Sequence, residues 1–153
     1  SMGLSLIFQL RAMMSNTFVG DIGYTIPLIL IVSIWVNDTA AYLVGSLIGR
    51  RPLSSISPNK TWEGTIAGIL ISVLLVTKIM GQYIPLSEKS IFLISIVASI
   101  AGTFGDLVES KLKRLAGVKD SGTMMPGHGG FLDRFDSILL ATPFVWLLIQ
   151  LVY

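Results

Sequence analysis

The chain has 153 residues, of which 52% are hydrophobic and 13% are charged, and its formal net charge is +2. So few charged residues could hardly cover a water-soluble domain with polar surface, so the composition favours a membrane protein over a soluble one. The chain has no cysteine, which excludes disulfides, thiolate metal sites and cysteine nucleophiles.

The first apolar stretch runs from Leu4 to Met14. It is shorter than the roughly 20 residues that a membrane-crossing helix needs, and it lacks the basic flank and cleavage site of a signal peptide. We expect a short helix here, lying at the membrane interface or left over from a lost span. Ser1 ahead of Met2 is typical of the scar that tag removal leaves, so we expect a shortened protein that lacks N-terminal helices.

Four later apolar runs are long enough to cross a membrane. The first begins near Pro27, a residue suited to the first turn of a helix, and ends at Gly49. The sequence therefore predicts an all-α fold, a polytopic integral membrane helical bundle of about four transmembrane helices plus the short N-terminal helix. The other three runs extend from about Glu63 to Met80, from Ser90 to about Val108 with a more polar continuation to Arg114, and from about Asp133 to Tyr153.

The second run carries Gly64, Gly68 and Ser72 at a spacing of four residues. Small residues at this spacing let helix backbones approach closely in lipid. This face predicts either a contact within the chain or a dimer seam, and we expect a homodimer.

Basic residues are distributed unevenly between the loops that join these runs. Lys78 and Lys89 flank the short turn after the second run. By the positive-inside rule the two long loops are cytoplasmic, so we expect an integral protein of the bacterial inner membrane with its active site facing the cytoplasm. These long loops hold most of the basic residues: Arg50, Arg51, Lys60, Lys111, Lys113, Arg114, Lys119 and Arg134.

Asp38 lies near the middle of the first run, where a carboxylate costs roughly 2.5–3.5 kcal/mol on insertion scales before it finds a partner. Together with Asn37, Tyr42, Gly45 and Gly49 it lies broadly on one side of a helix. We expect this small and polar face to point into the bundle, where Asp38 serves a functional site or makes a structural hydrogen bond to another helix.

The third run carries a polar stripe at three- and four-residue steps. Serines and threonines would be enough to hold helices together, whereas Asp106 and Glu109 bring negative charge to the cytoplasmic end, which favours a functional site. The stripe consists of Ser95, Ser99, Gly102, Thr103, Asp106, Glu109 or Ser110, and Lys113.

The segment SPNKTWEGT, residues 57–65, joins the first and second runs. Ser57 and Pro58 break the chain, and Thr61 precedes a helix with Glu63 in its first turn, which predicts a capped helix start. Lys60 adds positive charge beside the free backbone N–H groups of that start, a combination that can also hold a phosphate. By composition alone, capping is the favoured interpretation.

The segment SGTMMPGHGGFLDRFDS, residues 121–137, contains the single histidine of the chain, His128. Asp133 and Asp136 face the same way at a helix start, as Asp106 and Glu109 do at the end of the third run. A lone histidine is usually a packing or hydrogen-bonding residue, and carboxylates at helix N-termini are ordinary dipole partners. Gathered at one membrane face, however, this set favours divalent cations, and its oxygen ligands suit Mg²⁺ rather than zinc. Nearby basic side chains would neutralise phosphates: Lys111, Lys113, Arg114 and Lys119.

The segment SKLKRLAGVKDSGTMMPGHGGFLDRFD, residues 110–136, resembles the signature of the CDP-diacylglycerol synthases, also called phosphatidate cytidylyltransferases. The stretches NDTAAYLVGSLIGRR around Asp38 and SPNKTWEGT from Ser57 agree with the same family. Members of that family are usually longer at the N-terminus, so the chain resembles their catalytic C-terminal half. We expect residues 1–153 to form one transmembrane catalytic domain.

This resemblance implies transfer of the cytidylyl group from CTP to phosphatidic acid, giving CDP-diacylglycerol and pyrophosphate, with Mg²⁺ required. The implied partners are CTP, phosphatidic acid and membrane lipids, and no nucleic acid is expected. The resemblance also implies that Asp106, Asp133 and Asp136, together with His128, hold the cation or cations. The remaining implied site residues are Lys60, Lys113, Arg114 and Lys119 on the phosphates, Ser57, Asn59 and Thr61 as hydrogen-bonding groups, and Asp38 and Tyr42 along the cavity wall.

Two other functions share parts of this pattern. A CTP-dependent lipid kinase would use the same metal and phosphate groups to transfer the γ-phosphoryl group to a lipid hydroxyl, with Asp38 or Glu109 as the base. A cation or proton transporter would use the intramembrane Asp38 and Asp106. Nearly all the charge gathers on one face, which favours a one-sided catalytic mouth over a path through the membrane.

Overall fold

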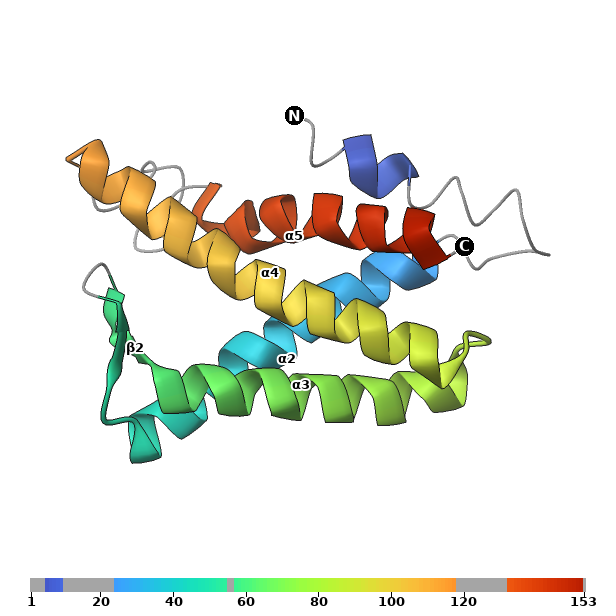
Figure 1. Cartoon of the computed structure of the whole chain (residues 1–153), viewed down its shortest axis with the longest axis horizontal. Helices are drawn as coiled ribbons and strands as arrows, with labels where there is room; N and C mark the ends of the chain where they lie inside the picture. The colour runs from blue at the N-terminus through green and yellow to red at the C-terminus, as the bar shows by residue number, and fades with distance from the viewer. Residues whose placement is uncertain (1–4, 10–23, 55–56, 118–131, 153) are drawn as a thin grey trace.

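The computed structural model describes residues 5–9, 24–54, 57–117 and 132–152, without the side chains of Pro58 and of residues 132–136. In these ranges, residues 5–9 are helical and four long helices follow (Figure 1). Their ends agree with the four predicted apolar runs to within a few residues, and the all-α fold class is confirmed. The helices are α2 (Thr25–Ile48), α3 (Trp62–Tyr83), α4 (Glu88–Leu115) and α5 (Leu132–Val152).

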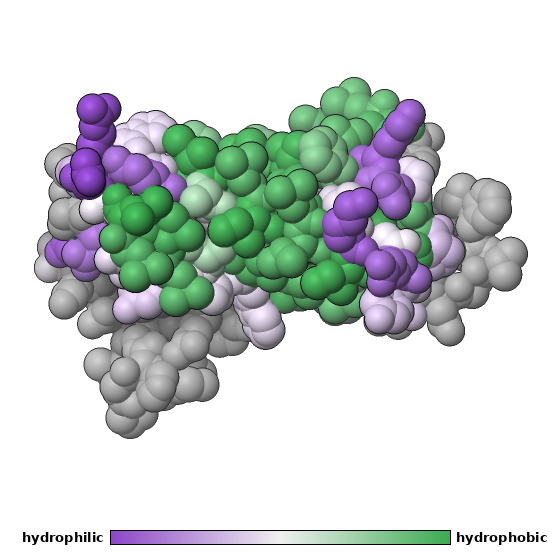
Figure 2. All heavy atoms as spheres, turned by 90° about the horizontal axis from the view of Figure 1, so that it is seen from below, coloured by the Kyte–Doolittle hydropathy of each residue, from purple (hydrophilic) through white to green (hydrophobic). Residues whose placement is uncertain are grey.

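Among the described helices, α2, α3 and α4 are long and apolar enough to cross a membrane, with 24, 22 and 28 residues. At a rise of 1.5 Å per residue even α3 measures about 33 Å, which covers a hydrocarbon core of about 30 Å. Figure 2 shows the corresponding surface, a broad apolar band with hydrophilic residues toward both of its ends. The protein is therefore an all-α membrane protein. The described apolar stretch of α5, Ser137–Val152, is shorter than 18 residues, so the fourth predicted span stays a prediction.

The small-residue face of α3 packs against α2 within the chain. A Cβ atom added at Gly64 would lie 2.6 Å from the Ala41 carbonyl oxygen, and one added at Gly68 would lie 2.8 Å from that of Asn37. Further along the same face, the Ser72 hydroxyl donates a hydrogen bond of 2.7 Å to a carbonyl oxygen of α2. Of the two predicted uses of this face, the contact within the chain is therefore correct and the dimer seam is wrong.

The apolar core lies between α2, α4 and α5, with a smaller contribution from α3. Figure 1 shows α5 and α3 on opposite sides of α4, while α2 crosses behind α4 and contacts all three of these helices. Large aliphatic side chains fill this core in the half of the bundle where α4 begins. The largest of its fully buried aliphatic side chains are Ile26, Ile29, Leu30, Val76, Ile91 and Val145.

Two short strands precede α3, which the sequence had not predicted. β1 (Pro52–Ser54) pairs with β2 (Ser57–Thr61) in antiparallel register, with Pro52 opposite Thr61. The segment predicted as a break in the chain is thus an extended strand, because the partner strand β1 supplies hydrogen bonds that the local sequence does not signal. This strand pair lies at the same end of the bundle as the last turns of α4 and the start of α5 (Figure 1).

Candidate functional site

The polar stripe of α4 faces the interior of the bundle, as its spacing predicted. Ser95 and Ser99 are fully buried, and Thr103 is 8% exposed. Ser99 donates a hydrogen bond of 3.1 Å from its hydroxyl to that of Ser72 on α3, which links the stripe to a neighbouring helix. The stripe therefore contributes to helix packing along much of its length, as the alternative interpretation held.

Asn37 connects α2 to this stripe one turn before Asp106. Its side-chain Nδ2 donates a hydrogen bond of 3.1 Å to Thr103 Oγ1, and Asn37 is only 1% exposed. The same Nδ2 lies 3.4 Å from Asp38 Oδ1, so one amide contacts both helices at this level. Sequence reasoning placed Asn37 on the polar face of α2 but gave it no role, because its partner lies far away in the sequence.

Lys60 and Asp106 meet in an ion pair, although the sequence gave them separate roles. Strand β2 carries Lys60 to the C-terminal third of α4, where its Nζ contacts Asp106 Oδ2. The two side chains are 33% and 32% exposed, so both can be reached from outside the bundle. A predicted phosphate-binding group and a predicted metal ligand are thus brought together at the polar end of the molecule.

The position of Lys60 follows from how the strand pair is joined to the helices. Thr61 is the N-cap of α3, as predicted, and its Oγ1 accepts a hydrogen bond of 3.2 Å from the Gly64 N–H. The Trp62 N–H donates to the Arg51 carbonyl oxygen at 3.0 Å, which closes the base of the strand pair. The backbone beside Lys60 is therefore held by α3, and the lysine side chain extends from it to Asp106.

Glu63 makes a contact that its position in a first helical turn did not reveal. Its Oε2 accepts hydrogen bonds of 3.3 Å from the backbone N–H groups of both Arg50 and Arg51. This carboxylate joins the segment after α2 to the first turn of α3. Glu63 therefore acts as a brace for the strand pair in addition to its favourable place at a helix N-terminus.

Glu109 and Lys113 form a second ion pair, within α4. Lys113 Nζ lies 3.3 Å from Glu109 Oε1, and the Glu109 side chain is only 8% exposed. Arg114, the next residue, lies in the same last turn of the helix and is exposed. Of the basic residues predicted to bind phosphates, Arg114 is thus open to solvent, while Lys113 is partly occupied by a carboxylate.

The orientation predicted for Asp38 and Tyr42 is wrong. Asp38 is exposed, and Tyr42 is 75% exposed, whereas the adjacent Asn37 is buried. Consecutive residues of a helix are about 100° apart, so the face predicted to point inward is divided between the interior and the outside. Asp38 nevertheless lies beside the contact between α2 and α4, because its Oδ1 accepts a hydrogen bond from the Asn37 side chain.

The other predicted site residues divide into two groups. On β2, Ser57 is half-buried and Asn59 is exposed, while the Thr61 hydroxyl oxygen already caps α3. The remaining predicted residues lie outside the described part: Lys119 and His128 entirely, and Asp133 and Asp136 with their side chains, although their backbone belongs to α5.

Asp106 is the described residue that best fits a divalent cation. Among the described residues, no group of three His, Asp or Glu side chains surrounds a common point. Asp106 is nevertheless an accessible carboxylate, the type of ligand that Mg²⁺ prefers, and it already holds a cationic group in the form of the Lys60 ammonium. Asp106 therefore fits as one ligand of a cation, and further ligands must come from elsewhere.

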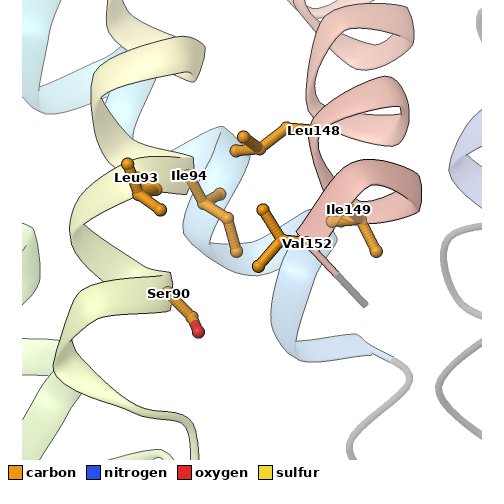
Figure 3. Close-up of a pocket in the computed structure, with 6 residues that line it drawn as sticks. All are labelled: Ser90, Leu93, Ile94, Leu148, Ile149 and Val152. Atoms are coloured by element: carbon orange, nitrogen blue, oxygen red, sulfur yellow. The ribbon is translucent and has the colours of Figure 1, made fainter.

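An apolar pocket between α4 and α5 lies far from these charges (Figure 3). The helical rise puts its Ser90 about 24 Å from Asp106 along α4. Among the described residues that line it, none is charged, so this pocket does not suit a phosphate. Its lining consists of Ser90, Leu93, Ile94, Leu148, Ile149 and Val152.

These features define a class: an all-α membrane protein that brings a lysine–aspartate pair and a polar helix stripe to one end of its bundle. Within that class, the chain belongs to the cytidylyltransferase family, whose model matches residues 1–152. The family resemblance of residues 110–136 is thereby confirmed.

Three relatives show the extent of the similarity. The chain is 49% identical over 123 residues to the phosphatidate cytidylyltransferase of Bacillus subtilis (strain 168), which covers 78% of this chain and 45% of the relative. It is 44% identical over 119 residues to that of Staphylococcus aureus (strain COL), covering 76% and 45%. It is 46% identical over 120 residues to phosphatidate cytidylyltransferase 4, chloroplastic, of Arabidopsis thaliana, covering 77% and 30%. The chain spans less than half the length of these curated relatives.

Proposed function

We propose that this chain carries the catalytic part of a phosphatidate cytidylyltransferase, which transfers the cytidylyl group of CTP to phosphatidate. The family membership and the activity for which the relatives are named support this proposal. The structural observation that carries it is the Lys60–Asp106 pair. It puts an anion-binding group and a cation-binding group side by side at the end of a membrane bundle.

In the proposed reaction, an oxygen of the phosphatidate phosphate attacks the α-phosphorus of CTP. A new P–O bond forms, the bond between the α-phosphorus and its bridging oxygen breaks, and pyrophosphate leaves. The attacking phosphate monoester is already an anion near neutral pH, so no general base is required. The residues of the chain must therefore hold two anions close together and stabilise the charge on the leaving pyrophosphate.

Basic side chains would bind these anions. Lys60 and Arg114 are accessible at the polar end of the bundle, and Ser57 and Asn59 on β2 add hydrogen-bonding groups nearby. Lys113 and Lys119 complete the proposed phosphate-binding set, and exposed Asp38 and Tyr42 would lie along its open side. Arg114 suits bidentate contacts to phosphate, whereas Lys60 acts as a mobile point charge.

Mg²⁺ is the proposed cofactor, and the proposed ligands are Asp106, Asp133, Asp136 and His128. When bound, the cation would neutralise phosphate oxygens and so favour departure of pyrophosphate. The oxygen-rich ligand set is the one that Mg²⁺ prefers.

The proposed location is the bacterial inner membrane with the polar end of the bundle toward the cytoplasm. The excess of lysine and arginine in the two long loops supports this orientation, and it suits a soluble donor and a membrane-bound acceptor. A homodimer remains part of the proposal through a surface other than the Gly64, Gly68 and Ser72 face, because α2 already covers that face.

A product assay tests the activity. The purified chain in detergent would receive labelled CTP, phosphatidate and Mg²⁺, and the products would be separated by chromatography. The expected products are CDP-diacylglycerol and pyrophosphate; a phosphorylated lipid with CDP would indicate a lipid kinase instead. Asp106→Asn should lower the rate on the order of 100-fold, the loss typical for one group that stabilises developing charge. Lys89→Gln, an exposed change in the first turn of α4, should leave the rate unchanged.

A further inference from the structure

We propose that Lys60 is the counter-ion of Asp106 in the substrate-free protein. A divalent cation then binds Asp106 at full affinity only after the phosphates of a nucleotide have displaced Lys60. The inference rests on the proposed function, since it takes a nucleoside triphosphate and a divalent cation as the ligands. It adds that the two ligands are bound cooperatively and that one ion pair produces the cooperativity.

The contact itself shows the competition. The Lys60 ammonium contacts Asp106 Oδ2, one of the two carboxylate oxygens that a metal ion could use. A divalent cation and an ammonium on the same carboxylate repel each other, because both are positive and neither is screened well at such short range. Lys60 must therefore leave for Asp106 to bind a cation at full strength.

The pair is built so that it can exchange. Each side chain is about one-third exposed, and ion pairs accessible to water contribute little net stability. Asp106 is fixed on α4, while the backbone around Lys60 is fixed by the Thr61 cap and the Glu63 brace. Only the flexible lysine side chain has to move, so the exchange needs no rearrangement of helices.

In the second ion pair, Glu109–Lys113, a cation could not easily replace the lysine. Glu109 and Lys113 lie on one helix at the i, i+4 spacing, and the Glu109 carboxylate is only 8% exposed. An incoming cation would have to reach the buried carboxylate of Glu109, which is already paired with Lys113 of the same helix. Asp106 differs because its partner comes from another element and because both groups can be reached.

Charge balance explains why a phosphate chain would trigger the exchange. A nucleoside triphosphate offers several anionic oxygens, so Lys60 gains a stronger set of partners than one carboxylate. Asp106 is then left without its counter-ion at the moment when a cation arrives. Because linkage is reciprocal, the nucleotide raises the affinity for the cation by the same factor as the cation raises the affinity for the nucleotide.

Mn²⁺ binding without nucleotide, followed by electron paramagnetic resonance on the purified chain, tests the first half of the inference. Lys60→Gln should bind Mn²⁺ about 5- to 10-fold more tightly than the unaltered chain, a factor within the usual range of coupling. Lys60→Arg keeps the charge and should bind no more tightly than the unaltered chain, and Asp106→Asn should lose the site. Equal Mn²⁺ affinity for Lys60→Gln and the unaltered chain overturns the inference, as does an intact site in Asp106→Asn.

Binding of CTP in the presence of a chelator tests the second half and separates exchange from simple repulsion. When Lys60 is present, Asp106→Asn should bind metal-free CTP several-fold more tightly than the unaltered chain does, because the substitution removes the carboxylate that pairs with the lysine. In the Lys60→Gln background the same change should give a clearly smaller gain. An equal gain in both backgrounds would mean that Asp106 merely repels the nucleotide, and the inference would be wrong.

Neither binding experiment depends on turnover. Should the chain form no CDP-lipid while these affinities behave as described, the proposed function fails and the ion-pair exchange stands. Should CDP-lipid form while Lys60→Gln leaves the Mn²⁺ affinity unchanged, the exchange fails and the function stands. Lys89→Gln, at the other end of α4, serves as the matched control for loss of one lysine charge and should change neither affinity.

Discussion

Gly68→Ala is expected to destabilise the bundle, because α2 and α3 touch at this position. A Cβ atom at residue 68 would lie 2.8 Å from the Ala41 Cβ and 2.8 Å from the Asn37 carbonyl oxygen. Ordinary contacts begin at 3.4 Å, so the two helices must separate by about 0.6 Å at this point. The atoms in the way belong to the α2 backbone and to a short side chain, which cannot turn aside.

The expected magnitude follows from two opposing effects. Overpacking of this kind costs about 1–3 kcal/mol, while alanine is favoured over glycine within a helix by up to about 1 kcal/mol. With the full offset, a net loss of about 0–2 kcal/mol in the free energy of unfolding remains, centred on about 1 kcal/mol. The same separation would also lengthen the 2.7 Å hydrogen bond from Ser72 to Ser33, which lies further along this contact.

Gly81→Ala, in the same helix, provides the control. A Cβ atom there would meet Glu88 Cγ at 3.6 Å, an ordinary contact, so only the gain in helix propensity applies. Thermal unfolding in detergent, followed by circular dichroism, should show a lower midpoint for Gly68→Ala and an equal or higher one for Gly81→Ala. If both variants unfold at the midpoint of the unaltered chain, the close approach of α2 and α3 is not a determinant of stability.

Three further predictions concern the residues that position the site. Asn37→Ala removes the donor to Thr103 and should cost about 0.6–1.7 kcal/mol of stability, measured by unfolding in detergent, and should slow CDP-lipid formation; an unchanged rate would deny Asn37 a positioning role. Thr61→Ala removes the N-cap of α3 and should cost about 1 kcal/mol, whereas Thr61→Ser, which keeps the hydroxyl, should largely restore the unfolding midpoint. Glu63→Gln weakens two hydrogen bonds to backbone N–H groups and should increase amide hydrogen exchange at Arg50 and Arg51; unchanged exchange there would argue against the brace.

The helices could be predicted from the sequence, because apolar length is a property of each segment by itself. The runs ending at Gly49 and beginning at Glu63 lie within a few residues of the observed ends of α2 and α3. The cap at Thr61 was also predictable, since a threonine before a helical run needs no distant partner. The strand pair was not, because the partners of β2 lie in β1 and are recognised only once the chain has turned back.

The sequence by itself determined that this is a membrane protein of helices, that most of its lysines and arginines lie in the two long loops, and that α4 carries a polar stripe. Hydropathy and periodicity decide these properties locally. Only the tertiary structure decided that Lys60 lies on Asp106, that Asn37 rather than Asp38 is buried, and that Gly68 packs within the chain. Each of these depends on how helices far apart in the sequence cross, and a hydrophobic period of one helix does not specify which neighbour covers which part of its surface.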